Sequence, residues 1–154
     1  MNATLETADD RHVLRFEHRL DHPIERVWRA ITEPEQLRSW FPVSEPLKVA
    51  ESDPPSLLAG TWYGEELRFE LGGEGEGCLL VFTHAFADRA KAARDAAGWD
   101  CCLARMDALL AGEPLGERES LERWPDIHER YAESFGVDPR LGRETFAKHV
   151  TRQT

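Results

Sequence analysis

The sequence lacks the cysteine and histidine spacings that mark disulfide frameworks and local metal sites. Its 154 residues include only three cysteines, Cys78, Cys101 and Cys102, two of which are neighbours in the chain. No C-x-x-C pair and no H-E-x-x-H arrangement occurs. An odd cysteine count with this spacing is a poor basis for a disulfide framework. We therefore expect reduced thiols, no bound metal and no cofactor.

Motifs that mark a nucleophile or a phosphate-binding loop are also missing. No serine stands in a G-x-S-x-G elbow, and the glycine run at 72–77 is not followed by a lysine-bearing helix. The adjacent carboxylates of Glu65 and Glu66 would point to opposite faces of a strand, so they cannot act together as acid and base. The sequence offers no catalytic residue and favours a non-enzymatic role.

Basic residues are scarce, and no long apolar run is present. The chain has 19 Lys and Arg against 29 Asp and Glu, a formal net charge of −10. Proteins that bind phosphate backbones need clustered Lys and Arg, so we expect no nucleic-acid partner. No run approaches the ~18 apolar residues of a membrane span, and the N-terminal residues do not resemble a signal peptide. We expect a cytoplasmic protein without a membrane partner.

The clearest local pattern begins at residue 12. Apolar and polar residues alternate over 12–20, which predicts a strand with one buried face. Apolar residues then recur at helical spacing over 24–31, which predicts a short helix. We expect Asp21 or His22 to cap this helix and Pro23 to lie in its first turn.

A second short helix and further strands follow. Thr32 and Glu35 have the spacing of a capping box, which predicts a helix that ends near Pro42. The remaining strands are predicted from alternation and turn residues at about 47–49, 57–63, 67–71 and 78–84.

A long helix is predicted from about Asp88 to Ala111. Its apolar stripe consists of Trp99, Cys102, Leu103, Met106, Leu109 and Leu110, and Cys101 falls off this stripe. In the charged tail that follows, helical spacing predicts a docked helix from about Pro125 to Phe135, ended by Gly136. A last, shorter turn is expected at 144–149.

Three segments resemble one known family. Residues 23–41, PIERVWRAITEPEQLRSWF, resemble the entry segment of the activator of heat-shock-protein-90 ATPase homologue-like family, within the SRPBCC/START superfamily. Residues 53–62, DPPSLLAGTW, and 98–112, GWDCCLARMDALLAG, resemble its strand entry and its long C-terminal helix. The resemblance implies an α+β helix-grip fold, an antiparallel sheet wrapped on the long helix. We expect this domain over 11–112, with 113–154 as a helical extension docked on it.

The chain departs from the family pattern after Pro42. Relatives, as the resemblance implies, usually have two further strands before the turn at Asp53, whereas the interval here holds one short strand. We therefore expect about five strands, one hairpin fewer than usual, and an unpaired sheet edge. Such an edge attracts partners, so the tail or a second copy of the chain, as a homodimer, is expected to cover it. A divergent function would be sought first at this segment.

The resemblance also implies a ligand cavity between the sheet and the long helix. From strand alternation and the apolar faces of the helices, the side chains facing it would be His18, Trp40, Trp62, Phe69, Phe82, His84, Trp99, Cys102 and Met106. The competing interpretation is that these side chains simply fill the core. Likewise, the two histidines could orient a ligand or could be hydrogen-bonded core residues, and Cys102 is interpreted as a small buried hydrophobe.

Three functions follow from these patterns and from the resemblance. The first is a non-enzymatic protein that binds a small hydrophobic molecule. The second is a protein-interaction role like that of a chaperone-ATPase activator, which implies a part in stress response. The third is a cyclase of the polyketide type, which would depend on His18 or His84. We expect the first.

Overall fold

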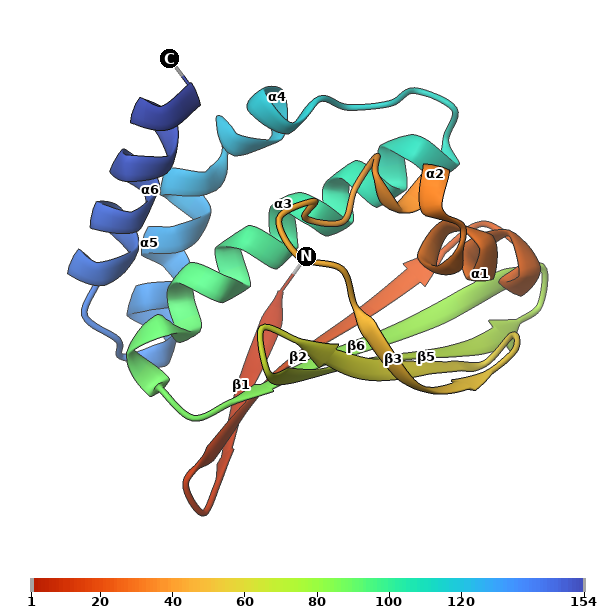
Figure 1. Cartoon of the computed structure of the whole chain (residues 1–154), viewed down its shortest axis with the longest axis horizontal. Coiled ribbons are helices and arrows are strands. Elements are labelled where there is room, and N and C mark those ends of the chain that lie inside the picture. Colours follow the sequence, from red (N-terminus) through yellow and green to blue (C-terminus); the bar gives the residue numbers. More distant parts are fainter. Residues whose placement is uncertain (1, 154) are drawn as a thin grey trace.

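Six antiparallel strands form one sheet, and the long helix α3 lies across one of its faces (Figure 1). The computed structural model describes residues 2–153. The strands are β1 (Ala3–Ala8), β2 (Arg11–Leu20), β3 (Lys48–Asp53), β4 (Leu57–Trp62), β5 (Glu65–Glu74) and β6 (Gly77–Phe86). Their order in the sheet is β1-β2-β6-β5-β4-β3. The predicted α+β helix-grip fold is confirmed.

The sheet has six strands rather than the predicted five or so, because β1 was missed. β1 pairs with β2 along its whole length, from Ala3 opposite Phe16 to Ala8 opposite Arg11. Among its side chains only Ala3 is fully buried, so the strand carries no clear period-2 pattern. A turn with Asp9 at φ 57° joins the two strands, a conformation that Asp tolerates.

Helices cover one face of the sheet. Near one end lie α1 (Ile24–Thr32) and α2 (Pro34–Leu37). The predicted long helix is confirmed as α3 (Ala92–Leu110), preceded by one 3-10 turn, η1 (Arg89–Lys91). The tail forms α4 (Glu117–Leu121), α5 (Trp124–Phe135) and α6 (Arg140–Gln153). The structure thus contains α4, which was not predicted, and a final helix longer than the expected turn.

The tail packs along a second side of α3 (Figure 1). The Tyr131 hydroxyl on α5 donates a hydrogen bond to the buried Asp100 carboxylate at 2.8 Å and accepts one from the Ala3 backbone N–H at 3.0 Å. Gly136 ends α5 at φ 66°, as predicted. No helix in the described part of the chain is long and apolar enough to cross a membrane.

Both predicted caps at the start of α1 and α2 are wrong. Pro23 itself is the N-cap residue of α1, and no side chain caps that helix. Thr32 is the last residue of α1, and its hydroxyl donates to the Trp28 carbonyl at 2.7 Å. A hydroxyl that bonds the carbonyl four residues earlier is no longer available as a cap. Glu33 therefore takes the N-cap position of α2.

Aromatic side chains fill the space between the sheet and α3. Phe82 stacks on Phe69 with ring centroids 4.7 Å apart and on Phe16 at 6.0 Å. Trp99 of α3 meets Phe82 edge-on at 4.8 Å, and the fully buried Trp40 meets Phe69 in the same way at 6.1 Å. Rings at these distances leave little free volume between sheet and helix.

The helix α3 is buried on two sides, which corrects the prediction for Cys101. The sequence pattern placed Cys101 off the apolar stripe, but its side chain is buried and its thiol donates to the Ser120 carbonyl at 3.3 Å. The tail supplies this second contact surface, which the periodicity of α3 alone could not reveal. Cys102, placed on the stripe, is only partly buried.

One short strand, β3, fills the interval between Pro42 and Asp53, as predicted, and forms one edge of the sheet. Its pairing with β4 shifts by one residue between Val49 and Glu51, a β-bulge. Gly60 of β4 lies directly beneath this site, where an added Cβ would stand 2.2 Å from the Lys48 carbonyl oxygen. The glycine thus permits the close approach of the two backbones.

Candidate ligand-binding pockets

The predicted cavity residues fall into a buried group and a partly exposed group. Trp40, Phe69, Phe82, His84, Trp99 and Met106 are buried in the core, whereas His18, Trp62 and Cys102 are partly exposed. Two pockets open nearby. Phe69 lines the first, and Trp62 and Cys102 line the second. The structure therefore does not bring the predicted set together around one cavity among the described residues.

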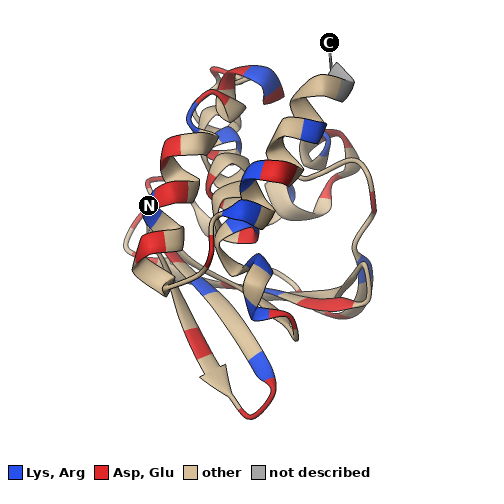
Figure 2. Cartoon of the chain, turned by 90° about the vertical axis from the view of Figure 1, so that its left-hand side faces the viewer, with Lys and Arg blue, Asp and Glu red and all other residues tan. Residues whose placement is uncertain are grey.

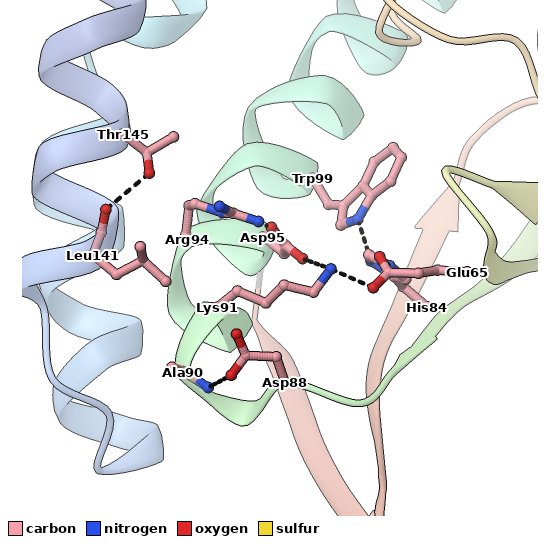
Figure 3. Close-up of polar contacts among 10 residues, drawn as sticks. All are labelled: Glu65, His84, Asp88, Ala90, Lys91, Arg94, Asp95, Trp99, Leu141 and Thr145. Carbon is pink, nitrogen blue, oxygen red and sulfur yellow. Dashed lines mark hydrogen bonds and ion pairs between the residues drawn. The ribbon is translucent and has the colours of Figure 1, made fainter.

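His84 is held by hydrogen bonds at both ring nitrogens (Figure 3). The Trp99 indole N–H donates to Nδ1 at 2.9 Å, so Nδ1 carries no proton. Nε2 is then the protonated nitrogen, and it donates to Glu65 Oε1 at 2.9 Å. Burial lowers the pKa of His84 below its ordinary value, which keeps the imidazole neutral. This histidine fixes Trp99 and Glu65 in place, with no nitrogen left for a ligand.

Charged side chains continue this network outward from Glu65 (Figure 3). Burial opposes ionisation of Glu65, but hydrogen bonds from Lys91 and His84 outweigh it and lower its pKa. The Lys91 ammonium bonds Glu65 and lies 3.5 Å from Asp95 Oδ2. Arg94 Nε donates to the same aspartate at 3.0 Å.

Three members of this network have the composition of a metal site. Glu65, His84 and Asp95 each offer a ligand atom, and these atoms lie within 4.8 Å of one another. Lys91, however, already supplies a positive charge between the two carboxylates, and Nε2 of His84 holds a proton. The donor set therefore fits an ion-pair network better than a metal centre.

The remaining polar candidates are also engaged or inert. His18 Nε2 lies 2.7 Å from Asp107 Oδ1 at the C-terminal end of α3. Burial raises the pKa of Cys101 to about 11 and that of Cys102 to about 12. Both thiols stay protonated near neutral pH, so neither has the thiolate character of a nucleophile.

The first pocket, named here the β3 pocket, lies beside the segment between Pro42 and β3. Its volume is about 670 Å³. Its apolar walls come from α1 and α2, the segment 41–47, β3, β4 and β5, and include Ile31, Leu37, Phe41, Leu47, Val49, Leu58 and Phe69. The few polar groups are Thr32, Arg38, Glu45 and Ser52.

The β-bulge in β3 gives this pocket its outer wall. Val49 and Ser52 are three residues apart and would point to opposite faces of a regular strand. The bulge adds one residue between them, so both side chains line the pocket. Val49 remains 56% exposed, because the pocket is open on this side. The apolar alternation of Leu47 and Val49 predicts a strand here, but it does not indicate the bulge that shapes the pocket wall.

The second pocket, named here the helical pocket, lies on the other side of residues 41–43. Its volume is about 560 Å³. Side chains of α3, α4, α5 and α6 line it, together with Trp62 and part of the segment 38–44. Arg38, Phe41, Pro42 and Val43 belong to both pockets, so this segment forms their common wall.

Comparisons with known proteins agree with this fold. Residues 21–54 match the family model described as activator of Hsp90 ATPase homolog 1-like protein. No curated protein sequence matches the chain.

Solved structures match over most of the chain. CalU16 from Micromonospora echinospora is 20% identical, with a TM-score of 0.70 over 87% of this chain and 96% of that one. EF2215 from Enterococcus faecalis, a conserved protein of unknown function, is 19% identical and has a TM-score of 0.74. The match covers 87% of this chain and 90% of that one. The AHSA1-like protein RHE_CH02687 from Rhizobium etli is 20% identical and has a TM-score of 0.60. The match covers 74% of this chain and 91% of that one. The predicted family resemblance is confirmed.

Proposed function

We propose that this protein, whose matched segment and fold are those of the activator of Hsp90 ATPase homologue-like family, binds a small hydrophobic molecule in the β3 pocket. The observation that carries the proposal is an apolar-walled pocket of about 670 Å³ beside the sheet edge. Ligand pockets for small molecules usually measure ~300–1,000 Å³ and combine apolar walls with a few polar groups.

The packing of the core supports this location. Between the sheet and α3, the stacked rings of Phe16, Phe69 and Phe82 and the edge-on Trp99 occupy the space that the family resemblance assigned to a ligand. β3 is the last strand on its side of the sheet within residues 2–153, and the apolar side chains of Leu47 and Val49 line the pocket. The family resemblance implies two further strands after Pro42 in relatives, and the single short strand here is consistent with room for a ligand.

The polar groups of the β3 pocket favour a mostly apolar ligand with few hydrogen-bonding atoms. Thr32 already donates its hydroxyl to the Trp28 carbonyl, which leaves Ser52 and Glu45, apart from Arg38 on the wall shared with the helical pocket. These groups can orient one polar end of a ligand, whereas the apolar walls supply most of the binding free energy.

A thermal-shift screen of lipids and aromatic metabolites, preceded by native mass spectrometry of gently purified protein, tests this function. A ligand at 100 times its dissociation constant should stabilise the fold by about 2.7 kcal/mol. Val49→Trp should fill the pocket without displacing core atoms, because Val49 is largely exposed. Lys48→Trp is the matched control, since the neighbouring residue of a strand points to the other face.

We expect a ligand that stabilises the wild type and Lys48→Trp but not Val49→Trp. A ligand-free mass together with a screen that finds no stabiliser would overturn the proposal. Equal stabilisation of the two tryptophan variants would also contradict it, because the ligand would then bind elsewhere.

A further inference from the structure

The helical pocket gathers positive charge in a chain that is strongly acidic overall. Its lining includes three arginines, Arg38, Arg94 and Arg105, against two carboxylates, Asp95 and Glu117. Counting only arginine, aspartate and glutamate, the lining carries one formal positive charge, whereas the whole chain carries a formal net charge of −10. Figure 2 shows that acidic and basic residues otherwise intersperse over the helices.

Two of these arginines have no carboxylate partner within the described residues. Arg94 bonds Asp95, but neither Arg38 nor Arg105 forms an ion pair or a side-chain hydrogen bond in the described part of the chain. The Nε atom of Arg105 is buried and has no hydrogen-bond acceptor. A buried donor of this kind costs free energy until an acceptor reaches it.

The other groups around Arg105 have partners of their own or are uncharged. Glu117, the second carboxylate of the lining, lies 3.4 Å from His149 Nε2. Cys102, one helical turn earlier, has its pKa raised to about 12 by burial, so its thiol is uncharged near neutral pH. Asp95 is already shared between Lys91 and Arg94. The positive charge of the helical pocket is therefore available to a bound anion.

The rest of the lining combines apolar and aromatic side chains with Ser44, Ser120, Thr145 and His149. Phe41, Trp62, Leu121, Trp124 and Phe146 surround the arginines. Apolar walls around a cationic group are suited to a molecule with a hydrophobic body and one negative charge. A dianion, such as a phosphate monoester, would exceed the single positive charge left over and would be repelled by Asp95 and Glu117.

We propose that the helical pocket is a second binding site, distinct from the β3 pocket, that takes a small hydrophobic carboxylic acid. The carboxylate accepts hydrogen bonds from Arg105 and Arg38, and the aliphatic or aromatic body lies against the apolar lining. A guanidinium group is well suited to this role because its N–H groups match carboxylate geometry. The site lies between α3 and the tail helices, so it needs the extension that follows α3.

Isothermal titration with 4-phenylbutyrate and its uncharged amide tests this site. We expect the acid to bind at least tenfold more tightly than the amide. Arg105→Gln and Arg38→Gln should each lower the affinity for the acid by at least tenfold and leave the affinity for the amide unchanged. Arg19→Gln is the control, because the Arg19 side chain is 72% exposed on the sheet and its replacement changes the net charge by the same amount as the other two variants. It should bind the acid like the wild type.

Arg38 is exposed, so its replacement leaves the fold intact even if Arg105→Gln lowers stability. Equal affinity for acid and amide, no binding of the acid, or wild-type binding by both arginine variants would overturn the inference. Val49→Trp separates the two sites: it should abolish ligand binding in the β3 pocket and leave phenylbutyrate binding unchanged. Loss of phenylbutyrate binding in Val49→Trp would assign the acid to the β3 pocket and refute this site.

Discussion

Trp99→Phe removes one defined hydrogen bond from the buried His84. In the wild type the indole N–H donates to Nδ1 at 2.9 Å, and the histidine is completely buried. Phenylalanine has no donor, so Nδ1 becomes a buried acceptor without a partner. Leaving such a group unsatisfied costs ~1–3 kcal/mol of unfolding free energy. The smaller ring also loses buried area and packing contacts.

Trp124→Phe separates these two contributions. Trp99 is 3% exposed and Trp124 is 6% exposed, so the smaller ring costs a similar amount at both positions. Trp124 packs face to face with His128 and Phe146 and makes no hydrogen bond through its indole N–H in the described residues. The difference between the two variants therefore isolates the Trp99–His84 hydrogen bond.

Urea denaturation at pH 7.5, followed by circular dichroism, measures both variants. We expect Trp99→Phe to be less stable than Trp124→Phe by ~1–3 kcal/mol. In a thermal melt, each kcal/mol of that difference should lower the unfolding temperature of a chain of this length by ~2–4 °C. Equal losses within ~0.5 kcal/mol, the usual precision of additivity, would refute the assigned role of His84.

Three further predictions concern pH, helix packing and the sheet edge. The pKa of His84 is lower in the folded than in the unfolded chain, so the unfolded chain binds more protons. The free energy of unfolding should therefore fall as pH drops below about 6.5. Urea titrations of the wild type and His84→Gln at several pH values should show a smaller loss in the variant. Gly142→Ala places a Cβ 2.0 Å from His128 Nε2 and should cost ~1–3 kcal/mol, whereas Gly98→Ala meets nothing within 4 Å and should stabilise by ~0.4–1 kcal/mol in thermal melts. Homodimerisation through β3 stays a prediction, which light scattering after size-exclusion chromatography would check by giving twice the mass of one chain.

The fold was predictable because its main elements carry strong local patterns. The helix of residues 24–31 and the apolar stripe of α3 are set by their own periodicity, and both are present. β1 was missed because a mostly exposed edge strand has no such pattern. Cys101 was misplaced because its burial depends on Ser120, far along the chain and in a helix that was not predicted.

The candidate site was harder to predict, because alternation shows which side chains face inward but not how closely they pack. Phe69 and Phe82 were both placed facing a cavity, and in the structure their rings stack at 4.7 Å. The β3 pocket depends on a bulge between Val49 and Glu51, and the helical pocket depends on how the tail folds back over α3. Both are consequences of long-range packing that no local pattern contains.

Methyl-labelled protein bound to the strongest stabiliser from the thermal-shift screen gives the most direct test of where the ligand lies. Intermolecular nuclear Overhauser effects should connect the ligand to the methyl groups of Ile31, Leu37 and Leu58, which line the β3 pocket. Contacts to Leu103 and Met106 instead, in the fully buried space between the sheet and α3, would contradict the account.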